Sequence, residues 1–168
     1  NPVIKRFDKK GVGSELDVYS GVGSCDPRFP FICSTYRVSE HWQTGVLTRW
    51  CPWLAEMQPG MFVEIGTELA HERGIKNGDQ CIVKSARGEV ECIAIVTPRF
   101  KPFNIDGNPI HEVGIPWHYG WITTKDRIYN PADKKAEVFT QGDSANLLTP
   151  TVGDANTMIP ESKAFMVN

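Results

Sequence analysis

In the middle of the chain, apolar residues recur at every second position, which is the spacing of half-buried β-strands. This pattern predicts a strand over residues 90–96, and the neighbouring apolar segments over residues 61–65 and 80–85 predict two further strands. In the second of these strands, Cys81 and Val83 fall on the same face. Because that face is apolar, we expect it to be buried against the other strands.

The segment between the first two strands predicts a short helix followed by a tight turn. Thr67 can cap the N-terminus of the helix, which ends near Arg73, and Gly74 can adopt the left-handed conformation that often stops a helix. Gly78 allows a sharp turn, and the Asp79 carboxylate can accept hydrogen bonds from neighbouring amides. This order of strand, short helix, Gly-Asp turn, strand, hairpin and strand is typical of a double-psi β-barrel.

The rest of the chain shows weaker patterns. Residues 1–30 are rich in glycine and proline without a period and predict a connecting arm, so the folded domain is expected over residues 31–168. A tight hairpin turn is predicted at residues 105–108 and a last strand at 164–167. Residues 123–143 are polar and predict a surface insertion. The predicted fold class is therefore mainly β, a double-psi β-barrel with short helices and long loops.

Composition sets outer limits on function. The 168 residues are 40% hydrophobic and 23% charged, which is ordinary for a globular domain with its own core. A formal net charge of -2 gives no reason to expect nucleic acid as a partner, so any anion site must be local. No apolar run approaches the roughly 20 residues that span a membrane. The first residue is Asn1, and we expect a fragment, a processed piece or one part of a split protein.

The cysteines do not have the spacing of a metal site. None of the five forms a C-x-x-C pair, and their spacings fit no zinc or iron–sulfur pattern. Buried free thiols are the favoured interpretation, and a Cys25–Cys33 pair stays open. The cysteines are Cys25, Cys33, Cys51, Cys81 and Cys92.

Residues 36–49 carry the densest polar chemistry in the chain. Two arginines can bind phosphate oxygens in pairs, three hydroxyls can donate to the same oxygens, and a tryptophan offers a face for stacking. A glycine lets the backbone approach a ligand closely. This mixture predicts a loop around a large anionic ligand with flat rings; an ordinary surface loop is the competing interpretation. The candidate binding residues are Tyr36, Arg37, Ser39, His41, Trp42, Thr44, Gly45, Thr48 and Arg49.

Residues 116–121 form an aromatic cluster in which Trp117 and His118 are the candidate binding residues. Aromatic residues this close together provide either a stacking platform or core packing, and core packing is favoured for the cluster alone. With no cysteine or second spaced histidine nearby, His118 does not predict a metal site. His71 and His111 are expected at the surface.

Three side chains near the end of the chain could read the edge of a planar ring. A carboxamide can donate and accept in one plane, which makes Asn146 the main candidate. Asp154 and Asn156 could act in the same way, although after a glycine such residues more often form turns.

Several of these segments together resemble a known family. Residues 36–49, 74–79, 114–121, 146–150 and 152–157 are similar to the C-terminal cofactor-binding domain of molybdopterin oxidoreductases, and more narrowly to the large subunit of formate dehydrogenases. The resemblance covers almost the whole chain. Its first and last blocks are specific, and the middle ones are weaker alone.

The resemblance implies a ligand and a division of labour. The ligand would be molybdopterin guanine dinucleotide, two copies per molybdenum or tungsten, contacted by this domain without holding the metal. Lys163 would reach back to a pterin, and a solvated lysine is the equal alternative. No residue of this chain is expected to be catalytic or to bind the metal. The chemistry of formate and CO2 would lie elsewhere in the enzyme, together with an iron–sulfur cluster.

The same resemblance implies partners, which are the remainder of the catalytic subunit and an iron–sulfur electron-transfer subunit. It favours a periplasmic location, and a cytoplasmic one stays possible. Two alternatives stay open. One is the same domain in a nitrate, polysulfide or formylmethanofuran enzyme, and the other is a non-enzymatic double-psi barrel that binds peptides or proteins.

Overall fold

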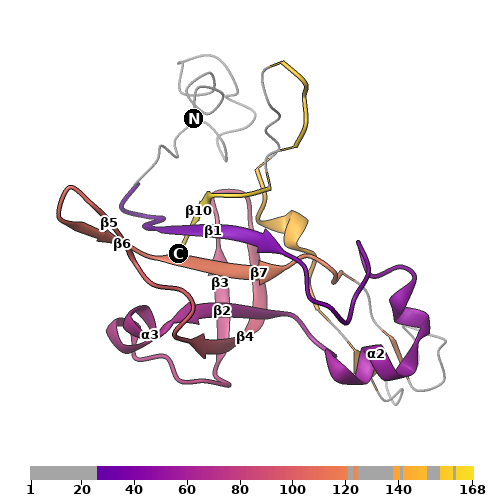
Figure 1. Ribbon diagram of the computed structural model, residues 1–168. Coiled ribbons are helices and arrows are strands. Elements are labelled where there is room, and N and C mark those ends of the chain that lie inside the picture. Colours follow the sequence, from indigo (N-terminus) through magenta and orange to yellow (C-terminus); the bar gives the residue numbers. More distant parts are fainter. Residues whose placement is uncertain (1–25, 121–122, 125–137, 141, 151–155, 161) are drawn as a thin grey trace.

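The computed structural model describes residues 26–120, 123–124, 138–140, 142–150, 156–160 and 162–168. Its centre is one curled sheet of six strands (Figure 1). These strands are β1 (Phe31–Tyr36), β2 (Phe62–Gly66), β3 (Gln80–Lys84), β4 (Glu89–Thr97), β7 (Glu112–Pro116) and β10 (Phe165–Val167).

The sheet mixes parallel and antiparallel pairs. Its strand order is β10-β1-β7-β2-β4-β3. β1 runs parallel to β7 and β2 runs parallel to β4, whereas the other pairs are antiparallel. The two edge strands meet where Lys84 and Asn168 exchange two backbone hydrogen bonds of 2.8 Å. This contact joins the two edges of the curled sheet, which is called the barrel below. The predominance of strands confirms the predicted mainly β fold class, while the double-psi connectivity stays a prediction.

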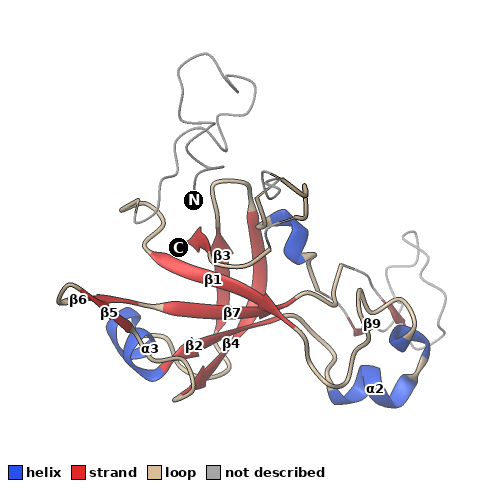
Figure 2. Ribbon diagram, turned by 45° about the horizontal axis from the view of Figure 1, so that its top comes forward, coloured by secondary structure: helices blue, strands red, loops and turns tan. Residues whose placement is uncertain are grey.

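Short helices and hairpins surround this barrel. Helices α3 and α2 lie at opposite ends of the sheet (Figures 1 and 2), and the β5–β6 hairpin has the turn predicted for residues 105–108. Strands β8 and β9 pair within the predicted insertion, which therefore contains regular structure; strands this short leave no periodic signal in a sequence. The bounds are η2 (Thr48–Trp50), α2 (Pro52–Met57), α3 (Thr67–Arg73), β5 (Phe103–Ile105), β6 (Asn108–Ile110), β8 (Thr123–Thr124), β9 (Val138–Thr140) and η3 (Ala145–Leu147).

The predicted helix and turn between β2 and β3 are confirmed, but the predicted Thr67 cap is wrong. Gly66 is the N-cap residue, and Thr67 lies within the helix with its hydroxyl donating to the Glu68 carboxylate. α3 ends at Gly74, which adopts the left-handed conformation with φ 67°. Gly78 also has a positive φ, of 91°. The Asp79 carboxylate accepts a hydrogen bond of 2.8 Å from the Lys76 amide and so fixes the turn. Local chemistry therefore determines this part of the fold.

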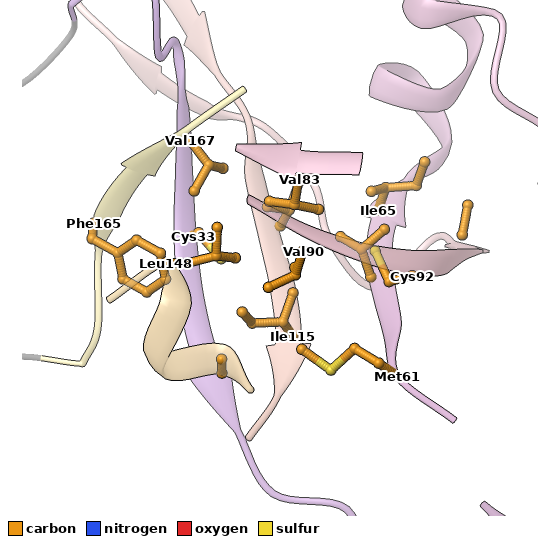
Figure 3. Packing of buried hydrophobic residues seen from close by; sticks show 14 of the residues in the cluster. Cys33, Met61, Ile65, Val83, Val90, Cys92, Ile115, Leu148, Phe165 and Val167 are labelled. Atoms are coloured by element: carbon orange, nitrogen blue, oxygen red, sulfur yellow. The ribbon is translucent and has the colours of Figure 1, made fainter. Parts of the chain in front are cut away.

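The barrel is filled by apolar side chains from every large strand (Figure 3). In residues 89–94 of β4 exposed and buried positions alternate, as the pattern predicted, and the last three residues of the strand are half-buried. Cys33 and Cys92 are buried free thiols within this core. Leu148, which follows η3, is 1% exposed and packs into the core beside Ile115 and Val167. The loop that carries Asn146 is thus anchored directly in the barrel.

Strands β1 and β7 were not predicted. In β7, residues 113–116 are all buried, so no polar residue alternates with the apolar ones there. In β1, the buried positions are Cys33 and Thr35, which are no more apolar than their half-buried neighbours. A Cβ atom at Gly114 in β7 would lie 2.5 Å from the Tyr36 ring and 2.7 Å from the Phe100 ring, so these rings cover the outer face closely. The expectation that His111 lies at the surface is wrong. It is 7% exposed, and its Nε2 lies 3.1 Å from the Glu72 carboxylate.

Candidate functional site

The parallel pairing of β1 and β7 brings the first two candidate segments together. Tyr36 at the end of β1 is in register with Pro116 at the end of β7. Because parallel strands point the same way, the residues after Tyr36 and after Pro116 leave the sheet at the same edge. The loop of residues 37–49 and the aromatic cluster that follows β7 therefore begin side by side.

His118 connects these two segments. Its side chain is 0% exposed. Nε2 accepts a 2.9 Å hydrogen bond from the Val38 amide, and Nδ1 donates to the Gln43 carbonyl. Burial lowers the pKa of His118, and the nearby His41 and Arg37 act in the same direction. The imidazole is therefore neutral at physiological pH and bonded to the loop at two points.

His41 holds the same loop from within. It is 4% exposed, its Nε2 lies 2.8 Å from the Gln58 carbonyl oxygen, and its Nδ1 lies 3.0 Å from the Thr48 hydroxyl. A carbonyl can only accept, so Nε2 carries a proton and donates to Gln58, while Nδ1 and the Thr48 hydroxyl form the second bond. The Tyr119 hydroxyl donates to the same Gln58 oxygen at 3.0 Å. The His41 ring also contacts the rings of His118 and Tyr119, with centroids 5.9 and 5.6 Å away.

The middle of the loop is a compact turn around Gly45, whose φ of 82° favours glycine. The Gly45 amide donates to the Trp42 carbonyl at 2.8 Å, and the Arg49 amide donates to the Gly45 carbonyl at 2.9 Å. Trp42 itself is 61% exposed, and Ser39 and Thr44 are also exposed. The turn therefore displays polar donors and one flat ring outward.

Two cations converge beside this turn. The Arg37 guanidinium lies over the Trp117 ring, 5.1 Å from its centroid. Lys163 is brought to the same place because the Ser162 carbonyl accepts from the Thr35 hydroxyl at 2.8 Å, which ties this segment to β1. Partial burial lowers the pKa of Lys163, and the positive charge of Arg37 lowers it further. The two side chains thus contribute positive charge to the same part of the surface.

The third candidate segment adjoins the second. The Gly120 amide donates to the Gly142 carbonyl at 2.9 Å, and Ser144 packs against Gly120. Ser144 caps η3 by accepting from the Asn146 amide at 3.3 Å, which leaves the Asn146 side chain exposed. These contacts hold the segment that carries Asn146 next to the aromatic cluster of residues 116–121.

The remaining candidates occupy different positions. Tyr36 donates its hydroxyl to the buried Glu64 carboxylate at 2.8 Å, and burial, followed by this bond, raises the pKa of Tyr36. Asn156 is exposed, and Asp154 lies outside the described residues. Arg49 is half-buried, and burial lowers its pKa. Each of these roles as a ligand stays a prediction.

Sequence reasoning missed the backbone groups that complete the site, which are the amide of Val38 and the carbonyls of Gln43 and Gln58. Tyr119 was within a predicted cluster, but its bond to Gln58 had no sequence signal. Within the described ranges, no group of three or more His, Cys, Asp or Glu side chains could hold a metal ion. No helix of the described residues is long and apolar enough to cross a membrane.

A mainly β barrel whose loops gather arginine, lysine, hydroxyls and flat rings at one end of two parallel strands defines a domain that binds a large anion with planar rings. The chain belongs to the molydopterin dinucleotide binding domain family, whose sequence profile matches residues 31–166. The family predicted from the sequence is therefore confirmed.

Relatives agree with this assignment. The chain is 58% identical over 144 residues to the formate dehydrogenase subunit alpha of Megalodesulfovibrio gigas, covering 86% of this chain and 13% of that protein. It is 43% identical over all 168 residues to the nitrate-inducible formate dehydrogenase major subunit of Escherichia coli strain K12, covering 14% of that protein. The chain thus spans only about an eighth of the length of these relatives.

A solved structure supports the fold alone. Acetylene hydratase from Pelobacter acetylenicus superimposes with a TM-score of 0.58 at 11% identity, over 84% of this chain and 18% of that one.

The side chains present fit a pterin dinucleotide. Its pyrophosphate requires cations and hydroxyl donors, which Arg37 and Ser39 at the exposed edge of the loop, together with the exposed Lys163, would supply. Its rings require flat faces and planar hydrogen-bonding groups, which Trp42 and Asn146 supply.

Proposed function

We propose that this chain is the cofactor-binding domain of a formate dehydrogenase large subunit and that it binds molybdopterin guanine dinucleotide. The observation that carries the proposal is the Arg37 guanidinium over the Trp117 ring, at the edge where the loop of residues 37–49 leaves the barrel. The neighbouring segment that carries Lys163 is tied to β1 and adds a second cation that interacts with Arg37. The names of the two formate dehydrogenase relatives favour this enzyme over others.

The residues of this chain bind and orient the ligand. Arg37 and Lys163 neutralise phosphate charge, and Ser39 and Thr44 donate hydrogen bonds to phosphate oxygens. Trp42 lies against a planar ring, and Asn146 pairs with a ring edge. Thr48 and Arg49 act closer to the backbone of the turn, since Thr48 bonds His41 and the Arg49 amide bonds the Gly45 carbonyl.

The dinucleotide, with its molybdenum or tungsten, supplies the redox chemistry when bound. In the proposed enzyme, formate loses two electrons and a proton to become CO2, and the electrons leave through iron–sulfur centres. The metal ligand and the groups that handle formate lie in other parts of the large subunit. This domain contributes binding, orientation and local positive charge.

The rest of the large subunit is the proposed partner of an exposed apolar surface. Six large apolar side chains between residues 42 and 57 are more than half exposed, and the most exposed is Trp53, at 79%. Such a concentration is unusual for a free surface and suits a contact with the remainder of a longer polypeptide. The surface consists of Trp42, Val46, Leu47, Trp50, Trp53 and Met57.

Cys51 provides a test of this contact, because it lies between Trp50 and Trp53 and is exposed in this chain. In the intact protein, iodoacetamide should alkylate Cys51 slowly. Replacing Trp50 and Trp53 with serine should loosen the contact and speed the reaction. Equally fast labelling of Cys51 in both proteins would show that the surface is uncovered.

The substrate is tested by assaying the intact protein with formate, nitrate and polysulfide. Oxidation of formate with a dye as acceptor, and no reduction of the other two, is the expected result. Reduction of nitrate or polysulfide would be compatible with the proposed cofactor site, but the protein would then be a nitrate or polysulfide enzyme rather than a formate dehydrogenase. The non-enzymatic barrel would gain support if the intact protein contained no pterin at all.

A further inference from the structure

The hydrogen bonds of His118 are those of a residue that holds a loop, and not those of a residue that binds a ligand. Both of its ring nitrogens bond backbone atoms of one loop, on Val38 and on Gln43. The ring is 0% exposed, so no ring atom is available to a ligand at the surface. Gln43 has a φ of 53°, an uncommon conformation for a residue other than glycine. A bond to its carbonyl stabilises this conformation.

Only one form of the imidazole satisfies both bonds. The Val38 amide donates to Nε2, which must therefore present a lone pair. The Gln43 carbonyl accepts, so Nδ1 must carry the proton. A second proton on Nε2 would place two N–H groups face to face and break the bond to Val38. The loop is thus bonded to the neutral Nδ1–H tautomer alone.

The surroundings disfavour protonation. Burial acts most strongly, and His41 and Arg37 also act against a positive ring, whereas the Gln43 carbonyl and Glu40 act in its favour. Trp117 and Tyr119, the neighbours of His118 in sequence, bring no positive charge to the ring. The net effect keeps the ring neutral.

We infer that His118 is a positioning residue, which holds residues 38–43 in the conformation that presents Ser39 and the following turn to the ligand. The identity of that ligand rests on the proposed function, but the bonding of the loop does not. The inference assigns His118 no contact with the dinucleotide.

Two substitutions separate positioning from simple packing. His118→Gln keeps a carboxamide that can bond the loop, and His118→Phe keeps a flat ring without nitrogen. His111→Gln is the matched control, because His111 is also buried and directly precedes the same strand, β7, at its opposite end. Its partner is Glu72 rather than the loop.

Hydrogen exchange of the intact protein, followed by mass spectrometry, measures the loop directly. In His118→Phe, exchange in residues 38–43 should be about tenfold faster, since two buried hydrogen bonds are lost. His118→Gln should recover most of this protection, and His111→Gln should leave the loop unchanged. Normal protection in His118→Phe, or no recovery in His118→Gln, would overturn the inference.

The same protection should depend on pH in the wild type. Because the pKa of His118 in the folded state lies below the ordinary value of 6.5, the bonds to the loop are present above that pH. They are lost as the pH falls towards the folded-state pKa. Corrected for intrinsic rates, loop protection should fall with acid in the wild type and stay flat in His118→Phe.

Failure of the two proposals can be told apart. If the wild-type protein contains no pterin dinucleotide but the loop responds as described, the proposed function fails and the positioning role stands. If the dinucleotide is present but hydrogen exchange in residues 38–43 does not change in the His118 variants, the positioning role fails and the proposed function stands.

Discussion

The barrel and the loop beside it are stabilised by different means. In the barrel, side chains such as Ile115 and Leu148 are almost completely buried among other apolar groups. The loop of residues 37–49 is instead held by two buried histidines, His41 within the loop and His118 after β7, whose ring nitrogens bond backbone atoms and a hydroxyl. Apolar packing tolerates changes of partner, whereas these hydrogen bonds require particular atoms at particular places. The difference suits a rigid support that carries a loop of defined shape.

The largest expected effect is on the barrel. Ile115→Ala should lower the free energy of unfolding by about 3 kcal/mol, because it removes buried methyl groups and leaves a cavity. Urea unfolding of the intact protein, followed by hydrogen exchange in the barrel strands, measures the loss. Ile82→Ala is the control, since Ile82 is 51% exposed and should cost less than about 0.5 kcal/mol. Equal losses would contradict the placement of the core.

The next largest effect is on ligand binding. Arg37→Ala and Lys163→Ala should each weaken dinucleotide binding by about 1.5–3 kcal/mol, because each removes a charge-assisted hydrogen bond to the ligand. The measurement is the guanine nucleotide retained per polypeptide after gel filtration in increasing salt.

The control for these two variants is Lys101→Ala, which removes an exposed cation next to the β5–β6 hairpin. It should retain the full nucleotide content. Barrel stability should be unchanged in all three variants. Loss of nucleotide in Lys101→Ala but not in the other two variants would show that the nucleotide binds near the β5–β6 hairpin and not at the loop of residues 37–49.

A smaller effect on local stability is expected at the Gln58 carbonyl, which accepts hydrogen bonds from both His41 and Tyr119. Tyr119→Phe removes one of two donors to the Gln58 carbonyl and leaves His41 in place. The expected loss is about 1 kcal/mol of local stability near Gln58, seen as faster hydrogen exchange at the end of α2.

Tyr36→Phe is the matched change on the barrel side, where the lost hydroxyl bonds Glu64. It should leave exchange at the end of α2 unaffected. Equal disturbance there in both variants would show that the two regions are coupled more strongly than their separate bonds suggest.

The sequence predicted the features that depend on local chemistry. The left-handed Gly74, the Asp79 turn and the alternating strands were correct because neighbouring residues determine them. Strand β7 was missed because both of its faces are buried, and β1 was missed because its buried positions hold Cys33 and Thr35 rather than large apolar residues.

In the candidate site, too, some features could be predicted from the sequence and others could not. The arginines, hydroxyls and tryptophan of residues 36–49 predicted a ligand that is an anion with flat rings, because this combination is unusual in a loop that binds nothing. The inward bonding of His41 and His118 could not be predicted, because their partners are backbone atoms that only the folded chain brings near. A histidine in a polar loop has the same sequence signature whether it binds a ligand or the loop itself.

The central claim is that this domain binds the pterin dinucleotide of a molybdenum or tungsten enzyme. The most direct test is elemental analysis of the purified intact protein, with acid-released guanine nucleotide measured on the same sample. The account predicts molybdenum or tungsten together with guanine nucleotide, and less nucleotide in Arg37→Ala. A protein that contains neither metal nor guanine nucleotide would contradict the account.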